Sequence, residues 1–361
     1  MDDIPQMSES SMESKRVTIY DIAKALDVSA STVTRALNGR KGVSDKLRDA
    51  IILKANEMGY RTNLIAKSLQ REKLRIGFVV NERVHGFNDR VIDGAKFAEK
   101  ELVDFNVEGY FKLLSRVNLR NSIKTEINRM VDEGIDGVVF VPNAKGEYDN
   151  FITELTQKGI AVGTVILKYT HPDVVFSVYP DGNRAGHIAA DMFHISGVPS
   201  GSEVLIMLGF STFDSHNKCV EGFNEANAQY GYKVQVIQHY DDAETAYRLV
   251  CKYLEETPTI KGIYCSTGTT ASICKAIRDM QRKDIKVIGT EITAETRACF
   301  EDGGLIATLF QDPFQQGRKA FKAMYEYLEG MKSEYISDIQ INPEIVVPGN
   351  LTYYEQFIIG T

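Results

Sequence analysis

Two different rhythms of apolar positions divide the chain near residue 74. Before it, apolar residues recur at helical spacing in short segments, which predicts three or four small helices. After it, short apolar runs alternate with amphipathic stretches, a pattern typical of buried parallel strands separated by helices. The predicted strands form two sets of five: residues 75–80, 109–114, 136–142, 160–166 and 174–180, then 202–208, 232–238, 260–266, 285–291 and 305–311.

The pattern predicts an all-α N-terminal domain followed by two doubly wound α/β lobes. Within the N-terminal domain, Thr18 and Asp21 form a capping box that begins the first helix. Ser29 is the predicted N-cap of the second helix, which ends at residues 38–39, and Ser44 caps a third. Two helices joined by a tight turn are typical of a helix-turn-helix, whose second helix enters the major groove of DNA.

The second helix has an unusual outer face. A helix that only has to stay soluble usually exposes Glu and Lys, but here small residues and one long cation stand in their place. Ala30 and Ser31 would let the backbone approach base edges, and Arg35 has the planar fork that bonds O6 and N7 of guanine. A surface arginine on a plain three-helix bundle is the alternative. Hydroxyl or amide groups suited to phosphate contacts are Thr18, Ser29, Thr32, Thr34 and Asn38.

Charge supports the nucleic-acid hypothesis. The formal net charge is -7, yet residues 15–73 alone carry 13 Lys and Arg against 6 Asp and Glu. A basic module joined to an acidic body is a footprint of nucleic-acid binding.

The amino-acid composition narrows the class of protein to which the chain can belong. No apolar run is long enough to cross a membrane, so no membrane partner is expected. Residues 1–14 are predicted to be a disordered acidic tail without a secretory signal. The five cysteines are well separated and odd in number, which fits reduced thiols in a cytoplasmic protein, without metal or cofactor.

At residues 17–39, "VTIYDIAKALDVSASTVTRALNG", the chain resembles the LacI/GalR family of bacterial transcription regulators, and residues 43–69 continue the likeness. The resemblance implies base reading by Ala30, Ser31 and Arg35. It implies backbone contacts by Tyr20, Thr34 and Asn38. The DNA-contacting residues implied in the hinge stretch are Asn63, Ala66 and Leu69, the last as an apolar wedge in the minor groove.

The same resemblance implies the domain boundaries. A helix-turn-helix domain over residues 15–61 is followed by a hinge helix over 62–73 and an effector-binding and dimerisation domain over 74–361. That domain is expected to have a type I periplasmic-binding-protein-like fold. Its N-lobe is expected at about 74–195 and 314–338, and its C-lobe at about 196–313 and 339–361.

In that fold, ligands lie between the lobes at the carboxyl ends of the strands. This rule and the family pattern nominate ten residues: Phe87, Asn88, Asp89, Asp181, His216, Cys219, Ser266, Thr267, Glu291 and Gln311. Phe87 is a platform for a sugar face or else core packing, and Asp181 binds hydroxyls or else caps the next helix. His216 is otherwise an ordinary loop histidine.

The candidate cleft departs from the family in its charges. Cys219 replaces an arginine that sugar-binding members often carry, and Ser266-Thr267 replaces Asn-Asp. Glu291 stands where an aspartate is usual. The cleft therefore lacks one cation and one carboxylate of the usual hexose set. A sugar or sugar derivative is the effector class that the resemblance implies.

These observations predict a regulator, most simply a repressor, that binds a palindromic double-stranded operator as a homodimer under control of a small molecule. A solute-binding protein of a sugar transporter is the alternative, disfavoured by the N-terminal helices and the lack of a signal peptide. An enzyme is not expected, because the chain has no GxSxG, Walker A or GxGxxG motif in the required context.

Overall fold

The structure is a computed structural model that describes residues 17–37, 42–58, 72–81, 86–114, 119–142, 145–211, 214–302, 304–331 and 338–357. It divides the chain into two compact units, Met1–Glu72 and Lys73–Thr361. Within the described ranges, no helix has the length and apolar character needed to span a membrane.

The N-terminal unit is a bundle of three short helices, α1 (Ile19–Ala25), α2 (Ala30–Leu37) and α3 (Asp45–Glu57). Seven apolar side chains form its core: Ile22, Ala23, Val33, Ala36, Val43, Ile51 and Ala55. Such a small core cannot tolerate polar substitutions, so the positions left free to vary are those on the outer faces of the helices.

The predicted caps of this unit are confirmed. The backbone N–H and the hydroxyl of Thr18 both donate to Asp21, at 2.8 and 2.7 Å. Asp27 adopts a left-handed conformation with φ of 53°, which turns the chain between α1 and α2. The backbone N–H of Thr32 donates to the Ser29 hydroxyl at 3.1 Å, and that of Leu47 donates to the Ser44 hydroxyl at 3.4 Å.

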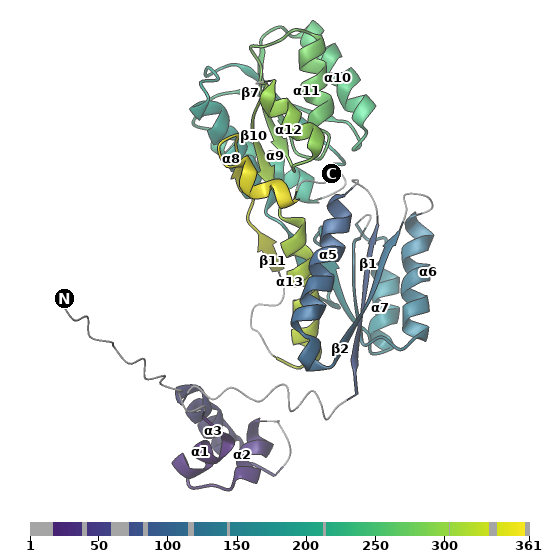
Figure 1. Cartoon of the computed structure of the whole chain (residues 1–361), viewed down its shortest axis with the longest axis vertical. Coiled ribbons are helices and arrows are strands. Elements are labelled where there is room, and N and C mark those ends of the chain that lie inside the picture. Colours follow the sequence, from purple (N-terminus) through teal and green to yellow (C-terminus); the bar gives the residue numbers. More distant parts are fainter. Residues whose placement is uncertain are drawn as a thin grey trace, which may run out of the picture. The chain divides into compact units, whose positions relative to one another are not determined.

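The first lobe of the C-terminal unit is a six-stranded sheet of order β11-β5-β4-β3-β1-β2 (Figure 1). Helices α5 and α13 cover one face, and α6 and α7 the other, around two separate apolar cores. The strands are β1 (Leu74–Asn81), β2 (Val107–Leu114), β3 (Gly137–Phe140), β4 (Ala161–Val165), β5 (Val174–Pro180) and β11 (Asp338–Ile341). The helices are α5 (Phe87–Glu101), η1 (Val103–Phe105), α6 (Leu119–Asp132), α7 (Asp149–Gln157) and α13 (Pro313–Leu328).

The second lobe repeats this arrangement with the strand order β12-β10-β9-β8-β6-β7. Helices α8 and α9 pack on one face and α10, α11 and α12 on the other. The strands are β6 (Glu203–Leu208), β7 (Lys233–Gln238), β8 (Ile260–Cys265), β9 (Lys286–Thr290), β10 (Leu305–Phe310) and β12 (Glu344–Val346). The helices are α8 (Gly182–Ile195), α9 (Asp214–Asn227), α10 (Ala243–Glu256), α11 (Thr270–Asp279), α12 (Ala294–Glu301) and η2 (Leu351–Phe357).

All ten predicted strands are present, and the structure adds β11 and β12, one at the edge of each sheet. Among the strands of the described residues, only β12 runs antiparallel to its neighbour. Both are short and half exposed, so they carry none of the continuous apolar runs by which the other strands are recognised. The two-lobed, doubly wound prediction is confirmed.

The chain crosses between the lobes three times, through very short links. One residue separates β5 from α8, two separate β10 from α13, and two separate β11 from β12. The first crossing falls at Asp181, earlier than the predicted residue 195, because α8 buries Ala189 and Phe193 in the core of the second lobe. The third falls after Ile341 rather than at 338, because β11 pairs with β5.

Helices α5 and α13 approach each other closely because both have a glycine at the contact. A Cβ added at Gly317 would stand 1.8 Å from the carbonyl oxygen of Val91, and one added at Gly94 would stand 1.9 Å from that of Phe314. Backbone atoms on both sides cannot move aside without separating the helices.

We therefore expect Gly317→Ala to lower the free energy of unfolding by about 2 kcal/mol, through overpacking of this contact. Gly304→Ala is the matched control, because a Cβ at Gly304 meets no atom within 4 Å. Urea unfolding of both variants measures the difference. Equal stability of the two variants would contradict the assigned contact.

Candidate functional site

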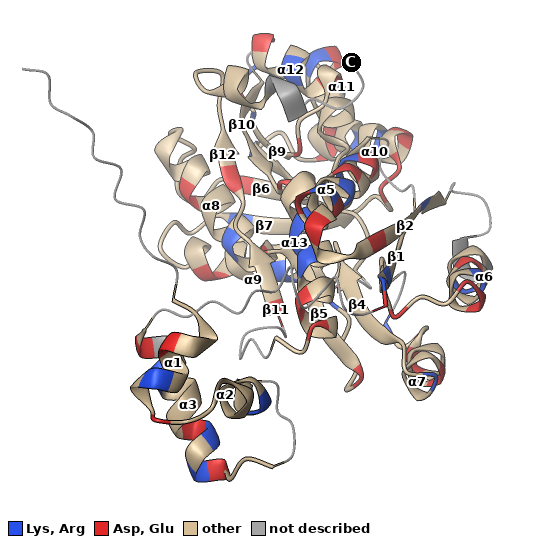
Figure 2. Ribbon diagram, turned by 60° about the horizontal axis from the view of Figure 1, so that its bottom comes forward, with Lys and Arg blue, Asp and Glu red and all other residues tan. Residues whose placement is uncertain are grey.

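The outer face of α2 carries short side chains and a single charged residue. Val33 and Ala36 are buried in the bundle, whereas Ser31 and Arg35 are exposed on the opposite side. Arg35 is the only charged residue of α2, whose other side chains are small or apolar (Figure 2). This geometry leaves the guanidinium as the tallest polar group on the helix, as a base-reading helix requires.

The predicted phosphate-contacting hydroxyls already bond within the unit. Ser29 shares hydrogen bonds of 2.8 Å with Ser31 and with Thr32, and the Thr34 hydroxyl donates to the Ala30 carbonyl at 2.9 Å. These bonds hold the start of α2 rigid, and a phosphate contact would reuse the lone pairs or rotate the hydroxyls. Tyr20 is 71% exposed. The other predicted DNA contacts, Asn38, Asn63, Ala66 and Leu69, lie outside the described residues, as does the hinge stretch up to residue 71.

A pocket of about 110 Å³ lies between the two lobes of the C-terminal unit, at the carboxyl ends of their strands. Eight of the ten nominated residues line it: Phe87, Asn88, His216, Cys219, Ser266, Thr267, Glu291 and Gln311. Nine further residues complete the lining: Val141, Ile166, Leu167, Pro180, Gly182, Ser215, Asp241, Gly268 and Thr290.

The two walls of the pocket differ in chemistry. The first lobe contributes an apolar wall that includes Phe87, Ile166 and Leu167. Phe87 also packs in the core of that lobe, which is one of the two roles predicted for it. The second lobe contributes a polar wall of hydroxyls, carboxyls and an amide. A ligand with one apolar face and one polar edge matches such a pocket.

Glu291 is the most deeply buried carboxyl group of the pocket. It follows β9 in a left-handed conformation with φ of 67°, and its carbonyl oxygen accepts from the Thr308 hydroxyl at 2.7 Å. Its Oε1 accepts from the backbone N–H of Gln311 at 3.2 Å. Its Oε2 is buried and has no partner among the described residues. Burial raises the pKa of Glu291 to about 8, although the Gln311 N–H opposes this shift.

A second carboxyl group, Asp241, was not predicted from sequence. It follows β7 in a left-handed conformation, and its Oδ1 is buried without a partner among the described residues. A Cβ added at Gly209 would stand 2.3 Å from this oxygen and 2.7 Å from Cε1 of His216, so a glycine leaves room for both side chains. Its position shortly after the strand predicted at residues 232–238 is the signal that could have nominated Asp241.

Two histidines lie near Asp241. Nδ1 of His216 is 2.9 Å from the backbone nitrogen and 3.0 Å from the carbonyl oxygen of Phe210, so it bonds to the Phe210 backbone in either tautomer. His239 is fully buried, with Nε2 3.4 Å from the hydroxyls of Thr267 and Thr269. Burial lowers the pKa of His239, which favours the uncharged ring.

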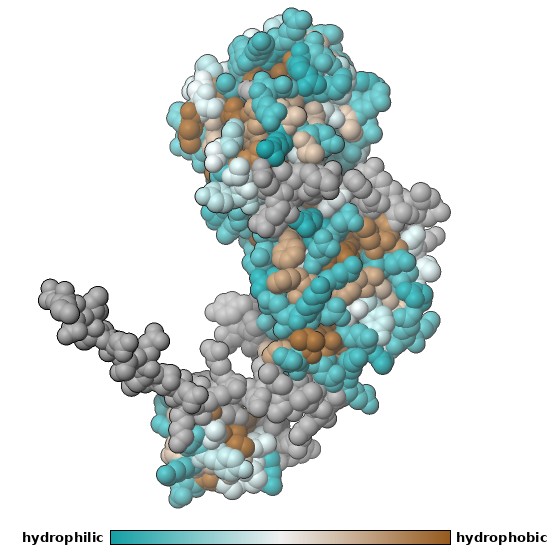
Figure 3. All heavy atoms as spheres, in the orientation of Figure 1, coloured by the Kyte–Doolittle hydropathy of each residue, from teal (hydrophilic) through white to brown (hydrophobic). Residues whose placement is uncertain are grey.

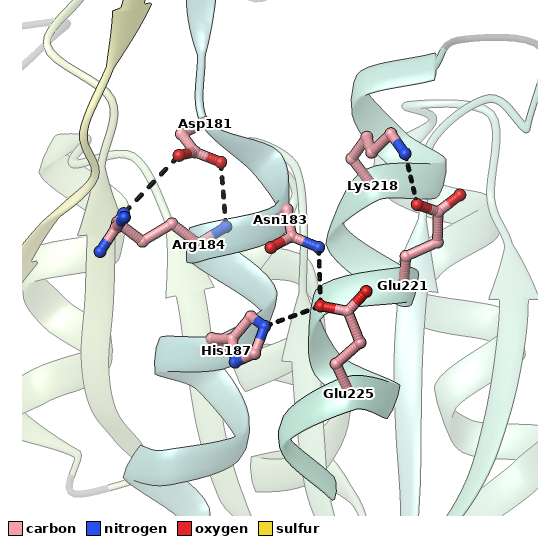
Figure 4. A network of polar contacts seen from close by, with 7 residues as sticks. All are labelled: Asp181, Asn183, Arg184, His187, Lys218, Glu221 and Glu225. Carbon is pink, nitrogen blue, oxygen red and sulfur yellow. Dashed lines mark hydrogen bonds and ion pairs between the residues drawn. The ribbon is translucent and has the colours of Figure 1, made fainter.

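Asp181 and Asp89, the other two nominated residues, are not among those that line the pocket. Asp181 caps α8, accepting from the backbone N–H of Arg184 at 3.0 Å, and its Oδ2 is 3.6 Å from Nε of the same arginine (Figure 4). This is the capping role that the sequence left open. In the same view, His187 and Asn183 of α8 contact Glu225 of α9, which ties the two helices together.

The described residues contain no group of His, Cys, Asp and Glu arranged to hold a metal ion. The Cys219 thiol donates to the carbonyl of Ser215 at 3.4 Å, and burial raises its pKa to about 11. The thiol therefore stays uncharged at neutral pH and replaces a family cation with a neutral donor.

Comparison with known proteins agrees with this architecture. Residues 76–332 match the model of the periplasmic binding protein domain, and residues 18–63 match that of bacterial regulatory proteins of the lacI family. The HTH-type transcriptional regulator RegA of Clostridium saccharobutylicum is 23% identical over 325 residues, covering 86% of this chain and 92% of its own. The HTH-type transcriptional repressor PurR of Pasteurella multocida is 21% identical, covering 91% and 97%.

Among solved structures, the solute-binding protein of an ABC transporter from Agrobacterium vitis, bound with alpha-D-tagatopyranose, has a TM-score of 0.71 at 15% identity. The match covers 80% of this chain and all of that one. The fold is thus that of a periplasmic binding protein attached to a helix-turn-helix. The chain belongs to the periplasmic binding protein domain family and carries the DNA-binding domain of lacI-family transcription regulators.

The buried Glu291 predicts a pH dependence of stability. Its pKa is about 8 in the folded protein against an ordinary value of 4.5, so between these values the folded chain keeps a proton that the unfolded chain loses. The free energy of unfolding contributed by this residue therefore falls as pH rises from about 5 to 8 and levels off above. We expect Glu291→Gln to gain stability relative to the parent over that range.

Denaturant unfolding at half-unit pH intervals measures this difference. Glu295→Gln, which changes an exposed glutamate on α12, is the matched control and should track the parent at every pH. A constant offset between Glu291→Gln and the parent from pH 5 to 8 would show that Glu291 ionises normally.

Proposed function

We propose that this protein is a transcriptional repressor that binds a near-palindromic operator as a homodimer and is controlled by a sugar or sugar derivative. The observation that carries the proposal is the presence, in one chain, of a helix α2 whose outer face has small side chains and a single arginine, and of a pocket in the C-terminal unit. A solute-binding protein does not need such a helix, because it does not bind DNA. A regulator of this kind acts in the cytoplasm.

DNA recognition is assigned to α2. Its start, held by the Ser29 hydrogen bonds, approaches the base edges, and Arg35 forms the bidentate contact to guanine. Each protomer of the dimer reads one half of the operator, so protein symmetry and operator symmetry correspond. Hydroxyl and phenol groups around α2 fix the register on the phosphates.

Dimerisation is assigned to apolar side chains left exposed on the C-terminal unit. Phe97 is 45% exposed, Val103 74% and Tyr327 45%, and all three belong to α5, η1 or α13 of the first lobe. Figure 3 shows hydrophobic patches breaking the hydrophilic surface of this unit. Exposed apolar patches on a protein of this size support subunit contact.

Effector binding is assigned to the pocket between the lobes. Its apolar wall suits the face of a sugar ring and its polar wall suits the hydroxyls, and the structural neighbour from Agrobacterium vitis binds a sugar. A ligand held by both lobes favours one relative arrangement of them. Because the first lobe is assigned the dimer contact, we expect the change in lobe arrangement to change operator affinity by a coupling free energy, typically about 1–3 kcal/mol.

For DNA, we expect Arg35→Ala to lose roughly 1–3 kcal/mol of discrimination between the cognate operator and a scrambled site. Lys54→Ala on α3 is the control, because it removes a cation that pairs with Glu57 and should weaken all sequences alike. Fluorescence anisotropy with both duplexes at one fixed salt concentration measures the ratio. An unchanged ratio in Arg35→Ala would remove Arg35 from base reading.

For the effector, we expect one member of a panel of sugars, polyols and sugar acids to raise the melting temperature and to change operator affinity. Saturation at 100 times the dissociation constant stabilises by about 2.7 kcal/mol. Gly209→Ala should abolish the shift, since its Cβ would displace Asp241 and His216, while ligand-free operator binding persists. Gly349→Ala, whose Cβ meets no atom within 4 Å, should keep it. A ligand that stabilises Gly209→Ala equally would bind elsewhere.

A further inference from the structure

The pocket has two carboxyl groups, each with one buried oxygen that has no hydrogen-bond partner among the described residues. Glu291 is 4% exposed, and its Oε2 is buried and unpartnered among the described residues. Asp241 adds a second buried oxygen, Oδ1, in the same condition. Both residues line the pocket from the second lobe. An unpartnered buried carboxyl oxygen is costly, so its presence in a binding pocket indicates a partner supplied by the ligand.

The described residues that line the pocket include no lysine and no arginine. Of the two histidines of the second lobe, His239 is buried with its pKa lowered, and Nδ1 of His216 is engaged with the Phe210 backbone. Cys219, where family members often carry an arginine, remains an uncharged thiol. The polar wall is therefore acidic rather than merely polar.

Charge complementarity separates three classes of ligand. A sugar acid or sugar phosphate would bring a further negative charge against Glu291 and Asp241, which is unfavourable at low dielectric. A neutral sugar would hydrogen-bond to the carboxyls while Glu291 keeps its proton, so it would form no ion pair there. An ammonium group both donates hydrogen bonds and neutralises the charge, and hydrogen bonds between charged groups are roughly twice as strong as neutral ones.

We propose that the effector is an amine-bearing polyhydroxylated molecule, of the class of amino sugars and aminocyclitols, with its protonated amine on Glu291. This proposal rests on the proposed function and narrows its ligand class. Asp241, which is only partly buried as a residue, accepts ligand hydroxyls. Ser266 and Thr267 lie close by for further hydroxyl contacts. The apolar wall of Phe87, Ile166 and Leu167 covers the ring face that carries no polar group.

The test uses matched pairs of sugars that differ only in the amine. D-Glucosamine is compared with D-glucose, D-galactosamine with D-galactose and D-mannosamine with D-mannose, and D-glucose 6-phosphate serves as the anionic probe. Calorimetry on the full chain at pH 7 gives the dissociation constants. We expect at least one amine to bind roughly tenfold or more tightly than its neutral partner, and the phosphate not to bind.

The assignment to Glu291 is tested by Glu291→Gln, which keeps the shape of the side chain and removes its ability to become charged. The variant should lose the preference for the amine, whereas the exposed control Glu295→Gln should retain it. Melting temperature and operator binding of each variant show that it is folded. Preference for the amine that survives in folded Glu291→Gln would overturn the assignment.

Proton exchange provides a readout that simple packing would not change. Glu291 holds a proton near neutral pH, and a bound ammonium group would expel it into the buffer. The titratable group that acts on Glu291 is Asp312 at the start of α13, whereas Asp241 and His216 of the polar wall act on His239. Binding enthalpies measured in phosphate and in Tris should differ for the parent and agree more closely for Glu291→Gln.

The outcomes separate the two proposals. Binding of a neutral sugar as tightly as its amine partner, or binding of the phosphate, would overturn the amine proposal and leave a sugar-controlled regulator intact. If no member of any pair binds, both the amine proposal and the sugar effector fail. Operator recognition by Arg35 is tested independently of all of these results.

Discussion

The structure depends on one constraint of parallel sheets, that all strands of a sheet end at a common edge. Two such edges face each other across the C-terminal unit, and the loops that follow the strands supply the pocket. Glu291 after β9, Asp241 after β7 and Ser266 after β8 are far apart in sequence and adjacent in space for this reason alone. The chemistry of the pocket is set by single residues at strand ends, which can change without disturbing either core.

The N-terminal unit has to be stable with a much smaller apolar core than the C-terminal unit has. Its core of seven apolar side chains leaves little margin, and the start of α2 is stabilised by a local network of hydroxyls instead. In the proposed DNA recognition this network would also help, because a rigid helix start loses less entropy on binding in a groove.

The spacing of apolar residues along the chain predicted most of the fold, because buried parallel strands are nearly continuous apolar runs that end in recognisable turns. It missed β11 and β12, which are too short and exposed to produce such a run. It also placed α8 in the wrong lobe, because the periodicity of a helix shows which side is apolar and not which core receives it. Crossing points depend on packing between distant segments, such as β11 against β5.

For the pocket, the rule that ligands lie at the carboxyl ends of strands was applied together with the family pattern. It therefore identified residues in segments that resemble the family and missed residues in segments that do not. Asp181 matched the pattern but caps α8, whereas Asp241 had no such match and lines the pocket. The unpartnered oxygens of Glu291 and Asp241 could not be predicted at all, because a missing partner is a property of three-dimensional packing.

The three links between the lobes contain one, two and two residues, and one of them includes Pro343. Two residues span at most about 7 Å even when fully extended, so the lobes cannot drift apart. What remains is rotation about an axis near the links, with the pocket on one side of that axis. The links therefore act as a hinge. A small molecule bound between the lobes rotates one lobe relative to the other without separating them, and the largest displacements occur at the parts of each lobe farthest from the hinge.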